Sequence, residues 1–534
     1  MHDKRFPILL LWLIGSLSLP AQEKGFLFTF VDAEHSWSAR DAVETESGDY
    51  IIGAWDYVGH DALLWKLSSD GGLLDQMYIS AEDTTVYLSN VLYMPDGQNG
   101  DFVAFCPCEP VDGAMASLLF IRFDDDLNVT MRKVVSCPFI EQDEHFFSIK
   151  ALSVDTCIYA AFTMQQGSLP TYKSITLTTL NSRGDFLNCQ RLDSIGNVCS
   201  LFCPSERSNR IGLFGPSNGN MAIQLFDEAL SLVKSETLYQ WTAPEGNNGE
   251  FCLYYIIDAI NSQALMLPNG SYMVSSRLNE TLLHSNGYPY KHDRSVILAR
   301  YGNDFQQPEN LLITEHMNDS IEYPAFFRSL DFRKTGEVGC DVFQCCILHE
   351  LPQYGLIQPY PTGLVVTKAD QNLNVEWKKR FLRDGIYQAM TINATADGGC
   401  LVVGSVGDYQ AQIFGIFALK INAEGTVGTD EILVEDMASV YPNPVKETLK
   451  IGGVEVFEVQ IYNTLGQLVK TVQNTNEVSL EGLPQGIYLL RVTLEGGKVF
   501  SGQILDIPCH LVRGRGPSRR GRKVLRGIPA DTIR

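Results

Sequence analysis

The chain has 534 residues, of which 45% are hydrophobic and 19% are charged, and its formal net charge at pH 7 is −22. This acidic balance favours solubility and disfavours binding to nucleic acid or to bare anionic membranes. The 13 cysteines suit a chain that enters an oxidising compartment, where disulfides can form.

Residues 1–21 have the layout of a secretory signal peptide. Lys4 and Arg5 precede an apolar run from Ile8 to Leu19, which is too short to span a bilayer comfortably. We expect cleavage after Ala21, and no later run predicts a membrane-spanning segment. The chain is therefore predicted to pass through the periplasm and not to span a membrane.

Residues 22–435 contain a repeated β unit. Each unit opens with a polar turn and an apolar strand, and the seven candidate starts are spaced by 52, 56, 54, 60, 66 and 62 residues. A second apolar strand follows, then an acidic or amide turn such as Asp124–Asp126, and usually a third strand. No convincing amphipathic helix interrupts this pattern.

A unit of about 50 to 60 residues with three or four antiparallel strands is typical of a propeller blade, because a small sheet buries both faces only against neighbours. The region resembles the loosely conserved β-propellers of exported bacterial proteins, with about seven blades. The sequence also allows six or eight blades, because the repeat pattern is weak in the fourth and sixth units. The alternative architecture is a stack of β-sandwiches.

Residues 436–440 are interpreted as a linker, and residues 441–505 predict a second, small all-β domain. Its short period-two runs alternate with turns, giving six or seven strands in about 65 residues, as in a sandwich. Its pattern is defined by Tyr441, Pro442, Asn443, Pro444, Gly466, Gly486 and Tyr488.

These residues resemble the C-terminal sorting domain, type A, of type IX secretion cargo from one lineage of Gram-negative bacteria. The resemblance covers about an eighth of the chain. It implies an immunoglobulin-like β-sandwich that outer-membrane export machinery recognises, and a passenger that is released or held at the cell surface. The competing interpretation is an ordinary β domain with no address function.

Residues 506–534 depart from the family pattern, which normally ends soon after the last strand. They carry eight Arg or Lys and no strand periodicity. Such a run can bind nucleic acid or an anionic surface, but its abrupt onset favours an altered reading frame. An altered frame would weaken export.

Cysteine and acidic clusters offer weak metal hypotheses. Cys106 and Cys108, and the group near Cys340, lack histidines at convincing ligand spacing, which favours disulfides or buried thiols over a metal. The segment Asp124–Asn128 has oxygens at calcium-like spacing but lacks the Gly and Glu that such a loop needs. A solvated turn is the favoured interpretation, and no metal or cofactor is predicted.

The sequence names no catalytic residue, because the patterns of nucleophile elbows, phosphate loops and zinc proteases do not occur in it. We expect a binding or adhesion propeller that holds a glycan or protein at its mouth. A propeller hydrolase acting on glycans, which needs a close carboxylate pair, and a purely structural surface protein are the alternatives. Candidate ligand contacts are loop tyrosines, which alternatively pack on neighbouring blades: Tyr288, Tyr290, Tyr354 and Tyr360.

Overall fold

The computed structural model describes most of the chain as β structure. Every regular element in the described ranges is a strand, so the all-β prediction is confirmed. Within those ranges, no helix has the length and apolarity that crossing a bilayer requires. The described residues are 25–31, 35–94, 101–110, 115–141, 144–166, 172–192, 198–203, 210–217, 220–238, 262–283, 289–302, 308–313, 320–350, 362–382, 386–408, 413–428, 433–436, 439–441, 447–452, 454–463, 465–484, 486–494 and 499–506.

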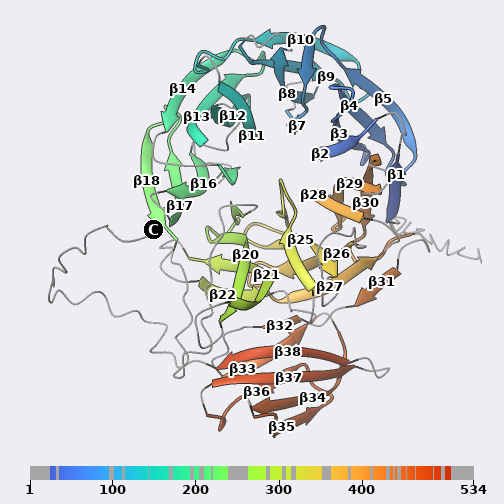
Figure 1. The fold of residues 1–534 in the computed structure, drawn as a ribbon, viewed down its shortest axis with the longest axis vertical. Coiled ribbons are helices and arrows are strands. Elements are labelled where there is room, and N and C mark those ends of the chain that lie inside the picture. The colour runs from blue at the N-terminus through green and yellow to red at the C-terminus, as the bar shows by residue number, and fades with distance from the viewer. Residues whose placement is uncertain are drawn as a thin grey trace, which may run out of the picture.

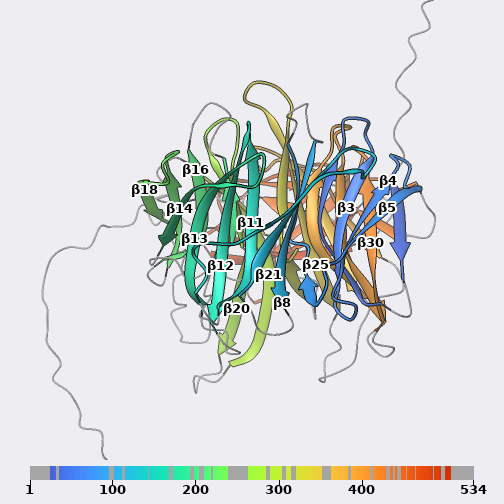
Figure 2. The same cartoon turned by 90° about the horizontal axis from the view of Figure 1, so that it is seen from above.

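Antiparallel sheets surround a common axis in the manner of a β-propeller. Figure 1 looks down this axis, and Figure 2 shows the ring from the side. Three of these sheets have the strand orders β2-β3-β4-β5, β11-β12-β13-β14 and β15-β16-β17-β18, with the first strand innermost. Between the first two of them lies a sheet in which β6 and β7 both pair with β8, followed by β9 and β10.

The strands of these sheets are β2 (Trp37–Glu44), β3 (Tyr50–Asp56), β4 (Ala62–Leu67), β5 (Leu73–Ile79), β6 (Thr84–Val86), β7 (Asn90–Tyr93), β8 (Phe102–Pro110), β9 (Ser117–Phe123), β10 (Val129–Val135), β11 (Glu144–Val154), β12 (Cys157–Gln166), β13 (Tyr172–Asn181), β14 (Phe186–Leu192), β15 (Ser200–Phe202), β16 (Ile211–Ser217), β17 (Asn220–Phe226) and β18 (Leu232–Thr237).

The next sheet has ten strands. Its main path is β19-β20-β21-β23-β25-β26-β27-β31, while β22 pairs with β21 and β24 with β25. Among the described residues, the backbone pairing between its two halves is the parallel bridge of β21 and β23 at Arg294 and Ile321. The strands are β19 (Gln263–Met266), β20 (Tyr272–Leu283), β21 (Pro289–Tyr301), β22 (Pro308–Ile313), β23 (Ser320–Pro324), β24 (Leu330–Lys334), β25 (Cys340–Glu350), β26 (Thr362–Asp370), β27 (Val375–Leu382) and β31 (Leu433–Asp436).

The N-terminal strand closes the ring. β1 (Phe26–Phe30) is the outermost strand of a sheet that also contains β28 (Ile386–Ala394), β29 (Cys400–Asp408) and β30 (Ile413–Ile421). It pairs antiparallel with β30, with Phe26 opposite Lys420. The buried Phe26 ring also lies 5.9 Å from the ring of Tyr50 on β3, measured between centroids. One sheet therefore joins the beginning of the propeller to its end.

The propeller has a hydrophobic core between each pair of neighbouring sheets in place of one central core. Leu64 and Ile51, for example, pack with Phe102 and Ile121 of the following sheet. The last sheet packs on the first through residues such as Val403 and Trp37. Because each sheet is apolar on both faces, its middle strands, such as β3 and β4, appear in the sequence as mainly apolar runs.

A recurring turn follows the third strand of several sheets. After β9, Asp124 Oδ1 accepts hydrogen bonds from the backbone N–H groups of Asp126 (3.0 Å) and Asn128 (2.8 Å), and Leu127 has a φ of 59°. The acidic segment with calcium-like spacing is thus a self-bonded turn. The same acceptor with a positive-φ residue three positions later recurs at Asn181–Gly184, Asp227–Leu230, Asp370–Leu373 and Asn422–Gly425.

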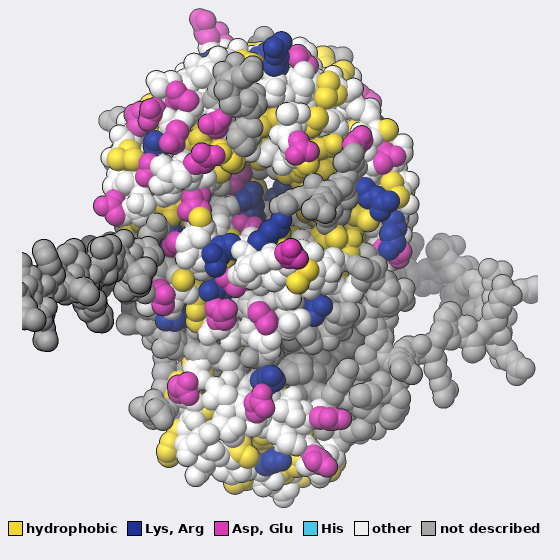
Figure 3. All heavy atoms as spheres, turned by 180° about the vertical axis from the view of Figure 1, so that it is seen from behind, with side chains coloured by type: hydrophobic (Ala, Val, Ile, Leu, Met, Phe, Trp, Pro, Cys, Tyr) yellow, Lys and Arg dark blue, Asp and Glu magenta, His cyan; other side chains and the backbone are white. Residues whose placement is uncertain are grey.

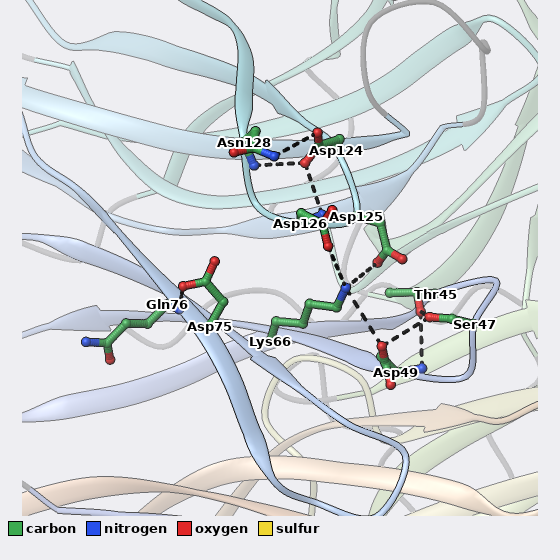
Figure 4. A network of polar contacts seen from close by, with 10 residues as sticks. All are labelled: Thr45, Ser47, Asp49, Lys66, Asp75, Gln76, Asp124, Asp125, Asp126 and Asn128. Atoms are coloured by element: carbon green, nitrogen blue, oxygen red, sulfur yellow. Dashed lines mark hydrogen bonds and ion pairs between the residues drawn. The ribbon is translucent and has the colours of Figure 1, made fainter.

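Buried cations connect these turns with the sheet before them. Lys66 Nζ on β4 lies 3.3 Å from Asp125 and 3.5 Å from Asp126 in the turn of the next sheet, and 3.8 Å from Asp49 (Figure 4). Burial lowers the pKa of Lys66, but these carboxylates outweigh burial and raise it. Arg122, at the matching position of β9, donates to a carbonyl in the following turn at 2.9 Å.

A smaller pair of sheets follows the ring. One has the order β32-β33-β36 and the other β35-β34-β37-β38. They share one core, in which Leu449 and Val478 pack with Ile461, Leu490 and Val492. β32 lies beside β22 and β33 beside β27, so this domain contacts the ten-stranded sheet (Figure 1). Its strands are β32 (Ser439–Tyr441), β33 (Thr448–Gly452), β34 (Val456–Asn463), β35 (Leu468–Gln473), β36 (Glu477–Ser479), β37 (Gly486–Leu494) and β38 (Val499–Asp506).

Candidate functional site

A small, open cavity of about 50 Å³ lies where the innermost strands of the ring converge. Its lining comes from β2, β7, β11, β15, β19 and β28, together with Phe327 and Arg328 just before β24. Figure 3 shows Lys and Arg side chains at the opening in the middle of the ring. A single cavity therefore collects residues from sheets all around the axis.

Irregular pairing places side chains at this cavity. The register of β2 with β3 shifts between Ala39 and Asp41, so Arg40 is an extra, bulged residue. β28 has a comparable shift between Ala389 and Thr391. Bulges bend a strand and redirect its side chains, and they recur beside functional sites.

The guanidinium of Arg40 lies among aromatic rings. It is 4.5 Å from the ring centroid of Phe327, 5.0 Å from that of Trp55 and 6.0 Å from that of Tyr57. Its Nη2 also donates to the Tyr57 hydroxyl at 3.3 Å. Burial lowers the pKa of Arg40, but a guanidinium keeps its proton at physiological pH.

Lys150 on β11 is the second cation at the cavity. Its Nζ donates to the Phe327 carbonyl at 2.8 Å and lies 5.3 Å from the ring centroid of the same residue. Burial first, and then the nearby Arg328 charge, lower the pKa of Lys150 to about 8. The amine is therefore mostly protonated at pH 7.

Arg328 and Asp41 form the one ion pair at the described cavity lining. Arg328 Nη2 lies 3.4 Å from Asp41 Oδ1, and Arg328 Nη1 also donates to Asn393. The buried Asp41 carboxylate accepts from Asn90 Nδ2 and Val91 N, both at 3.2 Å. With its oxygens committed to these donors, Asp41 serves as a structural acceptor.

A second carboxylate, Asp331, lies close to this region without lining the cavity. Burial raises its pKa, while Arg328 acts in the opposite direction. Its Oδ2 accepts from the backbone N–H of Ala394 at 2.8 Å. Among the described lining residues, Asp41 is therefore the one carboxylate, and a pair of carboxylates facing a shared ligand space is not found there.

Polar contacts between sheets hold the cavity wall in place. Ser200 Oγ and the backbone of Ala264 exchange two hydrogen bonds of 2.9 Å between β15 and β19. Gln263 Oε1 accepts from Leu330 N at 3.0 Å, and Thr391 Oγ1 donates to the Arg40 carbonyl at 2.8 Å. These bonds tie neighbouring innermost strands to one another, so the wall is preorganised.

The cysteine clusters singled out in the sequence form no metal centre among the residues that the structure describes. No group of three or more His, Cys, Asp or Glu is placed there to hold an ion. Cys106, Cys108, Cys340 and Cys345 are buried thiols that form no disulfide. Burial raises the pKa of Cys108 to about 11, which keeps this thiol protonated and unreactive.

The four predicted ligand tyrosines stay a prediction, because their side chains are not among those that the structure describes. Tyr290 belongs to β21, but its side chain is not among those described. The axial residues escaped prediction because their strands are short or bulged and mix charged with apolar side chains. The charged pair Arg40-Asp41 inside an otherwise strand-like run was the available signal. Three candidates lie outside the described residues: Tyr288, Tyr354 and Tyr360.

The predicted sorting residues fall in the small C-terminal domain. Gly466 has a φ of 74° in the turn between β34 and β35, Gly486 begins β37, and Tyr441 ends β32. Tyr488 is buried, and its hydroxyl donates to the Pro484 carbonyl. Outside the described residues lie Ala21, Pro442, Asn443, Pro444 and the tail from residue 507.

Residues 439–505 match the family model described as the secretion system C-terminal sorting domain. The chain carries a secretion sorting domain. This domain directs export to the cell surface or the extracellular space through an interaction with the export machinery. The resemblance seen in the sequence is confirmed.

Structural neighbours of the chain include propellers, all at low similarity. The Dos1 propeller has 11% identity and a TM-score of 0.38, covering 74% of this chain and 79% of its own. Phage phi92 endosialidase has 10% identity and a TM-score of 0.35, with 94% and 80% covered. An alpha-L-arabinanase of Penicillium chrysogenum has 8% identity and a TM-score of 0.35, with 76% and 100% covered. No curated protein matches the sequence.

Proposed function

We propose that the passenger is a non-catalytic binding module that the sorting domain delivers to the cell surface, and that its ligand site is the axial cavity. The observation that carries this proposal is the composition of the cavity. Strands from around the ring contribute three cations and aromatic surface, while the one described lining carboxylate is already bonded. Such a site suits recognition better than acid-base chemistry.

We further propose seven blades, a passenger at 22–435, a linker at 436–440 and an immunoglobulin-like sorting domain at 441–505. Seven inner segments at the cavity, one for each blade, support the blade number: β2, β7, β11, β15, β19, residues 327–328 and β28. Two sheets around one core support the sandwich. The signal peptide at 1–21 belongs to the same proposal.

The competing candidate is a glycan hydrolase. Two structural neighbours are named as an arabinanase and an endosialidase, which suggests this candidate. Their similarity to this chain is too low to support an inference of activity. A hydrolase needs two carboxylates that face one substrate, with one of them protonated. Asp41 lines the cavity, but its carboxylate already accepts hydrogen bonds from the protein, and Asp331 does not line the cavity.

A filled cavity tests the location of the site. Ala151 lines the cavity from β11, so Ala151→Phe should block it without changing any charge. We expect the purified full chain to retain a glycan or peptide ligand in an array screen, and this variant to lose it. Ala229→Phe, on an exposed turn far from the cavity lining, is the matched control.

Product analysis tests the absence of catalysis. The retained ligand is incubated with the full chain and its reducing ends are counted over time. We expect no release above the level seen with Ala151→Phe. Release that depends on the open cavity would establish a hydrolase and overturn the binding proposal.

A further inference from the structure

The cavity contains more positive charge than its surroundings neutralise. Arg40, Lys150 and Arg328 line it, and among the described lining residues only Asp41 opposes them. The chain as a whole has a net charge of −22, so a cationic centre runs against its general balance. All three cations are half-buried, and an excess of partly desolvated charge of one sign is unfavourable unless a ligand of the other sign relieves it.

Three other lysines of the ring are buried and paired, whereas the buried Lys378 Nζ has no hydrogen-bond partner among the described residues. Lys66 has three carboxylates within 4 Å, Lys368 lies 2.8 Å from Glu376, and Lys420 lies 2.6 Å from Asp397. These residues hold neighbouring strands and turns together. Their partners fully account for their presence.

Arg40 and Lys150 have no such partner among the described residues. The contacts of Arg40 are aromatic faces and the Tyr57 hydroxyl, while Lys150 contacts the Phe327 carbonyl and ring. A ring face and a carbonyl orient a cation without cancelling its charge. Most of the N–H donors of both groups therefore stay available to an acceptor in the cavity.

Aromatic surface lies directly beside these donors. Phe327 contacts both cations, and the Trp55 and Tyr57 rings lie 4.0 Å apart between centroids. Trp55 and Tyr57 contact Arg40 without lining the cavity, whereas Phe327 is part of its lining. An apolar ring face next to charged donors matches a sugar ring that bears an acidic substituent better than a bare inorganic ion.

We propose that the axial cavity binds an acidic sugar, with Arg40 and Lys150 contacting its carboxylate or sulfate oxygens and Phe327 facing its ring. Arg328 is a positioning residue, because its ion pair with Asp41 fixes the segment that carries Phe327. This inference rests on the proposed function and names the class of ligand for the same site.

The first experiment compares ligands on the full chain by titration calorimetry. The probes are an oligogalacturonate, a sulfated disaccharide, a neutral oligosaccharide of similar size and inorganic sulfate. We expect the acidic sugars to bind, with an affinity that falls as salt rises, and the neutral sugar and free sulfate to bind at least tenfold more weakly.

The second experiment removes the charges one at a time. Arg40→Gln and Lys150→Met should each weaken acidic-sugar binding roughly tenfold to a hundredfold, the range for a lost charged hydrogen bond. Lys234→Gln removes a cation from the outer strand β18 and should leave affinity within about twofold, because it is remote from the site. Arg40→Lys keeps the charge and should retain part of the binding, and a thermal melt of each variant confirms folding.

The outcomes separate the two proposals. Equal binding of acidic and neutral sugars, both lost in Ala151→Phe, would overturn the acidic-sugar inference and leave the axial site standing. Equal binding of free sulfate would also overturn it. Ligand binding that survives in Ala151→Phe would place the ligand elsewhere and overturn the site proposal itself.

Discussion

Lys150 is a half-buried base whose charged state the fold disfavours. Its folded-state pKa of about 8 lies below the value near 10.4 of an unfolded chain. The cost is complete below pH 8, where both states are protonated, and fades as pH rises toward 10.4. We therefore predict that Lys150→Met raises the free energy of unfolding of the ligand-free protein at pH 7.

Urea denaturation at several pH values checks this prediction, and the gain should shrink between pH 8 and pH 10. The groups around Lys150 are Arg40, Arg328, Asp41 and the Cys199 thiol, and Arg328 in particular favours the neutral amine. A variant less stable than the parent at pH 7 would show that Lys150 is structural. A gain in stability with a loss of binding is the combination expected of a ligand contact.

Asp56 is the opposite case. Its side chain is fully buried, which by itself raises the pKa, but hydrogen bonds from His35 (2.6 Å) and from the N–H groups of Ser36, Val58 and Gly59 outweigh burial and lower it. A lowered carboxyl pKa contributes stability above the unfolded value near 3.9, which is lost as pH falls through the folded value.

Asp56→Asn should therefore lower the free energy of unfolding at pH 7 by about 2 kcal/mol, because several charged hydrogen bonds weaken together. Urea titrations at pH 7 and at pH 3 measure the effect, which should be smaller in acid. Asp75→Asn on the exposed face of β5 is the control, with an expected change below about 0.5 kcal/mol. Equal losses in both variants would contradict the assignment.

At the scale of elements, the positive-φ residue of the recurring turn faces the preceding sheet. Where that residue is leucine, its own side chain fills the shared core, as at Leu127, Leu230 and Leu373. Where it is glycine, an aromatic ring of the preceding sheet takes the space: Phe26 over Gly71, Phe120 over Gly184 and Trp377 over Gly425. The residue in the turn and the side chain that faces it from the preceding sheet are therefore matched in volume.

Gly184→Leu tests this matching. A Cβ at Gly184 would lie 2.7 Å from Cγ of Phe120, so we expect a loss of about 3 kcal/mol in unfolding free energy. Gly48→Leu is the control, because Gly48 has a φ of 84° with nothing within 4 Å, and it should show the backbone strain alone. Adding Phe120→Ala to Gly184→Leu should cost clearly less than the sum of the single changes. If the losses in unfolding free energy were strictly additive, Phe120 and the turn at Gly184 would not interact.

The elements that sequence reasoning found are those with local signals. Leu63–Leu67 is a continuous apolar run beside an Asp-Gly turn, and β4 occupies it. The innermost strands lack such a signal: Arg40 and Asp41 interrupt β2, and the bulge at Arg40 breaks the period of two. The cavity could not be predicted from the sequence, because its lining residues are far apart in the chain and come together only when the propeller forms.

The whole molecule joins a propeller ring to a sorting domain, and the role of the sorting domain is testable by truncation. Removing residues from 439 onward deletes the matched sorting region, and we expect the passenger to stay in the periplasm. Surface digestion by protease and cell fractionation measure its location. Removing only residues 507–534 is the control, and it should preserve or improve surface delivery. Normal delivery without residues 439–506 would show that another segment carries the address.

The position of β1 affects how the ring is made. Phe26 pairs with Lys420, so the last sheet is complete only after almost the whole propeller has been synthesised and exported from the cytoplasm. Contacts of such long sequence separation form slowly. Until β1 docks, the outer side of β30 is an unpaired strand edge, which invites pairing with other chains. Closure by the N-terminal strand thus protects the ring against aggregation, and it makes the finished fold depend on a late pairing step.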